Sequence, residues 1–460
     1  MIYTDEPLSP GWWLKRLMGQ LIDRRPRYEL LQSYYDGTNG IPAYADAAVR
    51  DAARRLMAMS GTNYAELAIE ATRERMRPIG FRTGAQNDDL GDSEAWNVWQ
   101  ANSLDADHKL VDSTVLSLSQ AYTIVGAMDP DIGAPLITAE DPREVIAECD
   151  PARRRKVLAA AKVFHDDVYG TDVAYLYLPG YVIKAHRDHQ EGESADLSGW
   201  DWASAPESIG IPVVPVVPFA YRPRVRGLPK GEIEPHLRIL DRINYTLLNR
   251  LEIVTMQAFR QRAVKGVPTT NPDGTEVDYD ELFRQGPGAI WTLPATAEMW
   301  ESGSLDLTPI QSTVKDDATT FAAVTRTPLS YMIPDAAQGS AEGAQLTREG
   351  LTFKVVDRCG YAGESWEDTM ALSFLRMGDL ERANRRDLEI IWASPERYTL
   401  SERGSAASQA VGLSKRTVQE KIWQLTPQEI ARNEAELAAE ALLAPDPTPD
   451  PVPEPVGAAA

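Results

Sequence analysis

The hydrophobic and polar positions of residues 236–266 repeat with a helical period. This stretch, HLRILDRINYTLLNRLEIVTMQAFRQRAVKG, has no Gly or Pro before its last residue. Its apolar side chains recur in steps of three and four, at Leu240, Ile243, Leu247, Leu251, Val254 and Ala258. At 1.5 Å per residue a helix over residues 236–264 would be about 43 Å long. Because one helix cannot bury such a stripe alone, the pattern predicts a partner helix or a second subunit.

The N-terminal part of the chain is also predicted to be helical. Residues 12–35 carry a helical pattern on both sides of Pro26, and the turn-forming sequence DGTNGIP follows them. Two amphipathic segments come next, and Asn63 is placed as the N-cap of the second. The helices after them are expected to bury three apolar side chains, namely Trp96, Trp99 and Leu104.

From about residue 122 the pattern becomes shorter and alternates with a period of two. The runs are AYTIVGAM, PLITAED, EVIAECD, AAKVFHD and VAYLYLPGYVIKAHR. Turn residues separate them, so they are predicted to form an antiparallel sheet. The segment IPVVPVVPFAYRPRV is held extended by its prolines and is placed as an edge strand or a lead-in. The fold class is therefore α+β and mainly helical.

The second half of the chain continues with a small module rich in Pro and Gly, then a second helix over residues 311–327. A Pro- and Gly-containing loop and a further long helix follow, and DLEIIWASP has a strand-like pattern. Helices are expected over residues 401–443, with Ser414 and Thr426 as N-caps. The acidic, Pro-rich end, APDPTPDPVPEPVGAAA, is predicted to be a disordered tail.

Composition and charge narrow the possible functions. With 460 residues, of which 43% are hydrophobic, the chain can bury a substantial core and form two or more domains. No apolar run is long enough to span a membrane, and the N-terminus lacks the pattern of a signal peptide, so synthesis and retention in the cytoplasm are expected. The net charge of −21 argues against tight binding of duplex DNA. It remains compatible with a wall past which DNA slides.

Motifs of catalysis are absent from the sequence. It contains no phosphate-binding loop, no dinucleotide fingerprint, no zinc-protease motif, no nucleophile elbow and no C-x-x-C. Nothing pairs a nucleophile with a base, so no catalytic residue, metal or cofactor is expected.

Three groups of residues could still suggest chemistry. His186 and His189 lack a third metal ligand, so an exposed loop is the preferred interpretation. The carboxylates Asp88, Asp89 and Asp92 lack the closing Glu of a calcium loop and are interpreted as a solvated turn. The two cysteines, Cys149 and Cys359, are expected to be buried small hydrophobes without a disulfide.

The order of these parts resembles that of bacteriophage portal proteins, in particular the portals of tailed siphoviruses. Four stretches carry the resemblance: RRPRYELLQSYYDGTNGIP, LDRINYTLLNRLEIVTMQAFRQRAVKG, FAAVTRTPLSYMIPDAAQGSAEGAQLTREGL and KVVDRCGYAGESWEDTMALSFLRMGDL. None is a catalytic signature, and the specificity lies in their combination and order over essentially the whole chain.

The resemblance implies a portal fold assembled as a ring, usually of twelve subunits, at one vertex of a capsid. By this similarity the chain would divide into a wing, a two-helix stem, a small α/β clip, a tunnel loop and a helical crown. The implied ranges are 1–231 (wing), 232–264 (first stem helix), 265–308 (clip), 309–327 (second stem helix), 328–343 (tunnel loop), 344–400 (kinked helix and return to the wing), 401–443 (crown) and 444–460 (tail).

The implied function is mechanical. The ring would be the channel for double-stranded DNA during packaging and ejection, and the clip would dock the terminase large subunit and later the head-tail adaptor. The major capsid protein and a scaffold are further implied partners, and no membrane is involved. The protein would be made in the cytoplasm of the bacterial host and end in the virion.

The resemblance also suggests roles for individual residues. Four small or polar residues of the tunnel loop would face DNA, namely Gln338, Gly339, Ser340 and Gly343, or form only an exposed turn. Arg260, Gln261, Arg262 and Lys265 either meet backbone phosphates or complement the dipole at the end of the first stem helix. The dipole interpretation is preferred. The stem helix would pack through five residues of its apolar stripe, Leu240, Ile243, Leu247, Leu251 and Val254.

Two other classes of function are weighed against this one. The first is an oligomeric virion protein without a DNA channel, which the clip-like insert between two helices disfavours. The second is an enzyme with a nonstandard site, which the lack of a paired nucleophile and base disfavours.

Overall fold

The computed structural model describes most of the chain. The described residues are 2–39, 62–85, 91–188, 197–258, 262–267, 269–270, 274–278, 297–301, 303, 307–333, 341–396 and 398–443. Helices and strands are mixed throughout, as expected for an α+β fold. Several expectations fall outside the described residues: the tail 444–460, most of the clip, and the single residues Asp88, Asp89, His189, Arg260, Gln261, Gln338, Gly339 and Ser340.

The N-terminal part is helical, with one strand. Its elements are α1 (Pro10–Tyr35), α3 (Tyr64–Arg73), β1 (Pro78–Arg82), α4 (Ser93–Ala101) and α5 (Leu104–Leu118). The Asn63 side chain accepts a hydrogen bond from the backbone N–H of Glu66, which confirms the predicted N-cap. Trp99 and Leu104 are buried as expected, whereas Trp96 is only half-buried.

Helix α1 runs through Pro26 without a break, although the sequence indicated helix on either side of it. Pro26 is exposed, so water can satisfy the carbonyl that the missing N–H leaves unpaired. Leu21, Tyr28 and Leu31 are buried around it and hold both halves of the helix on the body. Tertiary packing thus outweighs the local preference of Pro.

The predicted strands are confirmed, but they form two antiparallel sheets instead of one. Three strands pair in the order β10 (Val216–Phe219), β2 (Ala121–Asp129), β3 (Ala134–Glu140), so the Pro-rich segment is an edge strand as predicted. The second sheet joins β4 (Val145–Cys149), β5 (Val157–Asp166), β6 (Thr171–Leu178), β7 (Tyr181–Asp188) and β8 (Asp201–Trp202), with β9 (Glu207–Ser208) beside β7. A turn at Asp141, closed by hydrogen bonds from Arg143, separates β3 from β4.

A small third sheet joins distant parts of the sequence. Strand β13 (Glu389–Trp392) was predicted, but its partner β1 lies in the segment that was expected to be entirely helical. The two strands are antiparallel, with Phe81 opposite Ile390. Helix α4 packs on β1, and α10 packs on β13, so this pair ties the N-terminal helices to the C-terminal half.

The largest core lies between the N-terminal helices, the three-stranded sheet and α10 (Ala341–Met377). Trp366 of α10 lies at its centre, in edge-on contact with Trp99 at 5.0 Å and Phe219 at 4.9 Å between ring centroids. A second core lies between α1 and the six-stranded sheet. Aromatic pairs in these orientations add to the stabilisation from burial alone.

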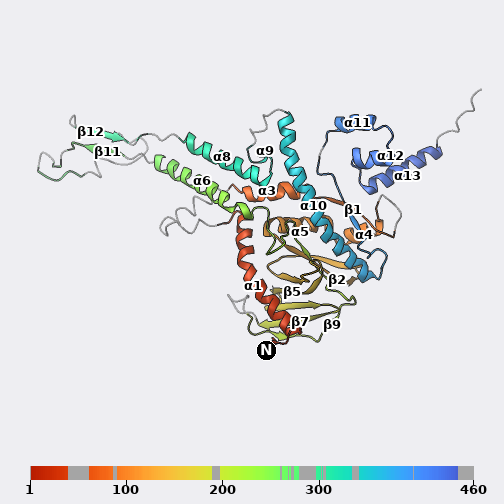
Figure 1. Cartoon of the computed structure of the whole chain (residues 1–460). Coiled ribbons are helices and arrows are strands. Elements are labelled where there is room, and N and C mark those ends of the chain that lie inside the picture. The colour runs from red at the N-terminus through yellow and green to blue at the C-terminus, as the bar shows by residue number, and fades with distance from the viewer. Residues whose placement is uncertain are drawn as a thin grey trace, which may run out of the picture.

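The rest of the chain projects from this body (Figure 1). A short 3-10 turn (Glu234–His236) leads into α6 (Leu237–Ala258), which is followed by strands β11 (Arg262–Lys265) and β12 (Glu298–Glu301). Helix α8 (Thr308–Thr325) returns to the body, where α9 (Leu329–Met332) precedes α10. Figure 1 shows α6 and α8 as an arm on one side of the body, with β11 and β12 at its outer end.

The C-terminal helices lie on the opposite side of the body from the arm (Figure 1). They are α11 (Leu400–Gln409), α12 (Lys415–Thr417), a π-helical turn (Val418–Ile422) and α13 (Pro427–Leu443). Ser414 caps α12, and Thr426 exchanges hydrogen bonds with Glu429 at the start of α13, so both predicted N-caps are confirmed. Thr399 and Glu402 add a capping box at α11.

Candidate assembly and channel surfaces

The arm formed by α6 and α8 is packed at its base and open toward its tip. Leu240, Ile243 and Leu247 are buried in the same core as Phe321 and Ala322 of α8. Leu251 is half-buried, and Val254 is 45% exposed. The predicted apolar stripe therefore finds its partner inside the chain for its first three residues, and its outer end remains accessible.

Polar side chains fix the arm to its neighbours near the base. The guanidinium of Arg242 on α6 makes two contacts with the carboxylate of Asp317 on α8, at 2.7 and 2.9 Å. The Tyr34 hydroxyl of α1 donates to Asp241 at 2.6 Å. Such two-point guanidinium contacts restrict orientation as well as distance, so they set the angle between the two helices.

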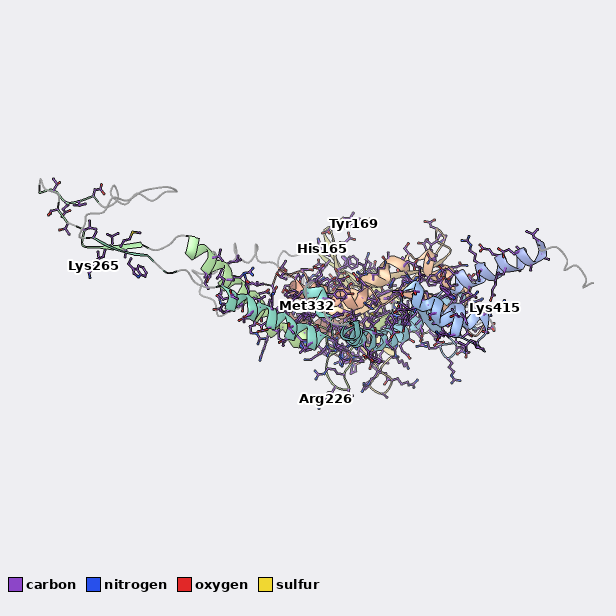
Figure 2. All side chains as sticks on the ribbon, turned by 90° about the horizontal axis from the view of Figure 1, so that it is seen from above. His165, Tyr169, Arg226, Lys265, Met332 and Lys415 are labelled. Carbon is purple, nitrogen blue, oxygen red and sulfur yellow. The ribbon has the colours of Figure 1, made fainter. Side chains whose placement is uncertain are left out.

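The tip of the arm is a strand pair rather than a continued helix. Helix α6 ends at Ala258, six residues before the predicted end, and Arg262 and Lys265 lie in β11. Pairing with β12, in which Lys265 is opposite Glu298, competes with the helical preference of this segment. Arg262 and Lys265 therefore lie beyond the last turn of the helix, and their expected role at its dipole or at phosphates stays a prediction. Lys265 is exposed and lies at the far end of the molecule from Lys415 (Figure 2).

Helix α10 contacts both roots of the arm, which are the places where the end of α8 and the start of α6 join the body. At the root of α8, the Lys354 ammonium donates to the carbonyl oxygen of Thr325, the last residue of α8, at 2.8 Å. At the root of α6, Arg358 Nε donates to the carboxylate of Glu232 at 2.5 Å. Lys354 and Arg358 are one helical turn apart and share a face of α10. One helix thus fastens the start and the end of the arm.

Both of these contacts are buried, so the loss of one partner should strongly affect stability. Lys354 is 2% exposed, and this burial lowers the pKa of its ammonium from 10.5 to about 8. Glu232 is also buried, at 6% exposed. A buried ion pair contributes little net stability, but loss of one partner leaves an uncompensated charge. The two contacts therefore act as fixed points for the arm.

The sequence carried a signal for this arrangement that the prediction did not use. Lys354 and Arg358 are flanked by the apolar positions Leu351, Val355 and Ala362, which are all buried in the core. Cations on the apolar face of a helix require buried partners. That pattern could have indicated contacts with a carbonyl and a carboxylate elsewhere in the chain.

The tunnel-loop segment differs in part from its expected boundaries. Residues 329–332 form α9, and α10 begins at Ala341, so Gly343 lies in a helix and not in the loop. Apolar residues from Leu351 onward anchor α10, and a helix gains from each further turn once it is nucleated. The other predicted DNA-facing residues, Gln338, Gly339 and Ser340, are outside the described residues.

The residues that the sequence analysis weighed as possible metal ligands, Asp92 and His186, belong to a helix cap and a strand. Asp92 is buried and caps α4, so the prediction of a solvated turn is wrong for it. Burial alone would raise the pKa of Asp92, but hydrogen bonds from Thr83 and Arg382 outweigh burial and hold this pKa below its ordinary value. His186 is exposed on strand β7 and not in a loop, because β6 pairs with the whole of this segment.

The two cysteines are free thiols. Cys359 is buried and Cys149 only half-buried, and burial raises the pKa of each thiol, to about 11 for Cys149. Within the described ranges, no three His, Cys, Asp or Glu side chains converge as a metal site. The described helices also include none that is long and apolar enough to cross a membrane.

Comparison with known proteins then identifies the family. A family model described as "Phage portal protein, SPP1 Gp6-like" matches residues 14–441. The chain belongs to this family of phage portal proteins.

The relatives agree with this assignment. The portal protein of Mycobacterium phage D29 is 27% identical over 424 residues, which cover 89% of this chain and 84% of the relative. The portal protein of Mycobacterium phage L5 is 28% identical over 397 residues, covering 83% and 78%. Portal proteins are structural, non-enzymatic components of the virion at the capsid, and this portal protein therefore has a place in the head-tail connector.

Solved structures give weaker matches. The neck of a native GTA particle, computed with C12 symmetry, matches with a TM-score of 0.43 and 11% identity, over 83% of this portal protein and 94% of that chain. The neck of an empty GTA particle, computed with C6 symmetry, matches with a TM-score of 0.46 and 11% identity, over 84% and 96%.

Proposed function

We propose that this portal protein assembles as a ring, usually of twelve subunits, at one vertex of a phage capsid. The ring is the channel for double-stranded DNA, which enters during packaging and leaves during ejection. Membership of the portal family supports this proposal. The arm provides further support, because α6 and α8 project from the body and Val254 is exposed at the outer end of α6, which suits contacts with neighbouring subunits.

The parts of the chain take different tasks in this proposal. The wing (1–231) forms the outer part of the ring, and the stem helices α6 and α8 line its narrow part. The clip, which includes β11 and β12, extends beyond them. The clip docks the terminase large subunit during packaging and the head-tail adaptor afterwards. Its place at the tip of the arm supports this role, since β11 and β12 carry the exposed side chains of Lys265, Met299 and Trp300.

DNA passes through the ring without sequence-specific contacts. We place Gln338, Gly339 and Ser340, in the segment between α9 and α10, next to the duplex, since small or polar residues allow a close and flexible approach to DNA. Arg262 and Lys265, with Arg260, are further candidates to meet phosphates. The net charge of −21 supports weak binding overall, because negative walls repel phosphates and keep the DNA mobile.

The remaining segments connect the ring to the capsid. Helix α10 and the return strand (344–400) link the stem to the wing, and the crown (401–443) faces the capsid interior. The major capsid protein and a scaffold contact the wing. Synthesis takes place in the cytoplasm of the bacterial host. The protein acts mechanically and carries out no catalysis, so it needs no cofactor.

Electron microscopy in negative stain and light scattering test this proposal directly. Rings with an open centre and a mass of roughly twelve times the 50.8 kDa chain are expected. Monomers or compact dimers at every concentration, also with the capsid protein present, would contradict it. Rings without a central opening would favour the alternative, an oligomeric virion protein with no DNA channel.

A second measurement separates the proposal from an enzymatic role. The purified protein is incubated with ATP or with DNA, and phosphate release or strand cleavage is recorded. No turnover above the buffer control is expected. Robust turnover that one point substitution abolishes would contradict a purely mechanical function.

A further inference from the structure

Two hollows follow one face of α10 on the surface of the body. The first, of about 310 Å³, lies beside the segment from Pro218 to Pro229. The second, of about 380 Å³, lies beside the segment from Pro212 to Pro218. Both are lined by Arg155, Pro218 and Asp368, so they are two halves of one depression, which we call the α10 groove. The ion pair between Arg155 and Asp368, at 2.6 Å, bridges it at the middle.

The walls of the α10 groove are mostly apolar. Val213, Val217 and Pro218 form one side, and Tyr361, Leu372 and Leu375 of α10 form the other. Val213 and Tyr361 are each 39% exposed. An apolar groove of this kind suits an extended segment with small apolar side chains, which needs no space for a helix.

The rim of the α10 groove is basic, in contrast to the chain as a whole. Five of its lining residues are cations, namely Arg154, Arg155, Lys156, Arg224 and Arg385, and the only lining carboxylate among the described residues is Asp368. Arg155 and Arg385 are both paired with Asp368.

The other three cations are available for a partner. Among the described residues, no carboxylate forms an ion pair with Arg154, Lys156 or Arg224. All three are exposed, and Arg154 reaches the carbonyl oxygen of Val225 at 3.3 Å, so the two basic loops lie together. In a protein of net charge −21, such a cluster selects an acidic partner by charge complementarity.

The C-terminal segment of the same chain has the matching chemistry. Residues 444–460 read APDPTPDPVPEPVGAAA, with Pro at every second position from Pro445 to Pro455. Between the prolines stand three acids, Asp446, Asp450 and Glu454, and one valine, Val452, and a second valine, Val456, follows the last proline. The segment contains no cation.

We propose that the α10 groove binds this acidic, Pro-rich segment, residues 444–460. Valine and proline side chains contact the apolar walls, and the three acids face Arg154, Lys156 and Arg224. A Pro-rich chain favours the extended polyproline conformation, so binding costs little conformational entropy. At 3.1 Å per residue the extended segment can span about 50 Å from Leu443, the residue at which α13 ends.

A nucleic acid fits the α10 groove less well. A phosphate backbone would use the cations but would gain nothing from walls of Val, Leu and Pro. The bound segment would connect the C-terminal helices to the wing, a connection that the ring proposal does not require. The inference is thus independent of the channel function.

Photo-cross-linking in the full chain tests the contact. Val452→p-benzoylphenylalanine places a cross-linker among the acids, and digestion with mass spectrometry identifies the attached peptides. We expect attachment to peptides of the α10 groove that contain Val213, Leu372 or Leu375. Cross-linking to other surfaces in preference to these would overturn the proposal.

Charge reversal supplies the matched comparison. K156E/R224E should lower the yield of the cross-link between position 452 and the α10 groove roughly tenfold, since two attractive contacts become repulsive. K109E/K415E changes the net charge equally at exposed sites outside the groove and should leave the yield unchanged. Neutralising the segment by D446N/D450N/E454Q should lower the yield similarly.

Two results would contradict this assignment. One is an equal cross-linking yield in K156E/R224E and in the control variant, which would show that these charges do not contribute to the contact. The other is a competition in which a short duplex DNA at low salt displaces the segment from the groove, whereas a polyglutamate peptide does not. Nucleic acid would then be the preferred occupant. Displacement by polyglutamate, weakened at high salt, supports an acidic peptide site.

Discussion

Lys354 shows how one buried charge controls the pH dependence of stability. Its folded-state pKa is about 8, below the ordinary value of 10.5, so between these values the unfolded chain binds more protons. Stability contributed by this group therefore rises as the pH increases from 8 to 10.5 and is constant below 8. The gain is at most about 3 kcal/mol.

Comparison of Lys354→Met with the wild type isolates this effect. Urea unfolding at pH 7.5, 8.5 and 9.5 should show the unfolding free energy of the wild type rising relative to that of the variant. Lys315→Met, at an exposed position of α8, should show no such trend. Parallel pH profiles of the wild type and Lys354→Met would contradict the buried-charge assignment.

Asp112 titrates in the opposite sense. It is fully buried, and burial raises the pKa of its carboxyl from 3.8 to about 7, although the Tyr221 hydroxyl donates to it. Between pH 3.8 and 7 the folded chain binds more protons than the unfolded chain, so the contribution of this group is lost as the pH rises through that interval.

Asp112→Asn removes this titration. We expect the unfolding free energy of the wild type, relative to that of the variant, to fall by a few kcal/mol between pH 4.5 and 7.5. Thermal melts across this range measure the difference, and the exposed Asp131→Asn serves as the comparison. A difference that is independent of pH would show that Asp112 does not titrate there.

At the scale of elements, α10 fixes the arm through Glu232 and Arg358. Arg358→Met leaves the Glu232 carboxylate buried without its partner and should destabilise the protein by about 3 kcal/mol. Hydrogen exchange should accelerate at the base of α6, residues 237–247, while β5 to β7 keep their protection.

A double-mutant cycle checks this coupling. The variant E232Q/R358M removes the unpaired charge, so its loss of unfolding free energy should be smaller than the sum of the two single changes. Additive losses, or faster exchange throughout the body, would show that the pair does not hold the arm specifically.

Most elements could be predicted from the sequence because their patterns are local. Alternation in residues 121–188 indicated β2 to β7, and the caps at Asn63, Ser414 and Thr426 are local hydrogen bonds. Strand β1 could not be predicted, since its five residues take their conformation from a distant partner. The end of α6 was misplaced for the same reason, because residues 262–265 have a helical pattern in the sequence but pair with the distant strand β12.

The candidate site was predictable only in outline. Periodicity located the apolar residues of the arm, Leu240, Ile243 and Leu247, because a core-facing stripe repeats along one helix. The contacts of Lys354 with Thr325 and of Arg358 with Glu232 join positions far apart in the chain, and no local pattern specifies such pairs. Asp92 was misassigned because its partner Arg382 is equally distant.

At the scale of the whole molecule, we expect exposed apolar residues on α10 to take part in the proposed ring assembly. Phe353 is 62% exposed and Val356 is 53% exposed, on the side of α10 away from the core. Phe353→Asp should shift assemblies toward monomers by more than tenfold in dissociation constant while leaving the melting temperature of the monomer nearly unchanged.

Sedimentation velocity measures this shift. Tyr169→Asp, at an exposed position in the turn between β5 and β6, is the matched control and should assemble like the wild type (Figure 2). Normal rings formed by Phe353→Asp would exclude this face of α10 from the interface between subunits.

The pairing of β1 with β13 also determines the order in which the protein can be completed. Arg82 and Glu389 are 307 positions apart, yet they face each other in this small sheet. At a synthesis rate of 5–20 residues per second, β1 waits on the ribosome for roughly 15 to 60 s before its partner emerges. A prematurely terminated chain cannot close this sheet. A chain that ends before Glu389 lacks β13, so we expect β1 to stay unpaired in it and the N-terminal helices to stay untied from the C-terminal half.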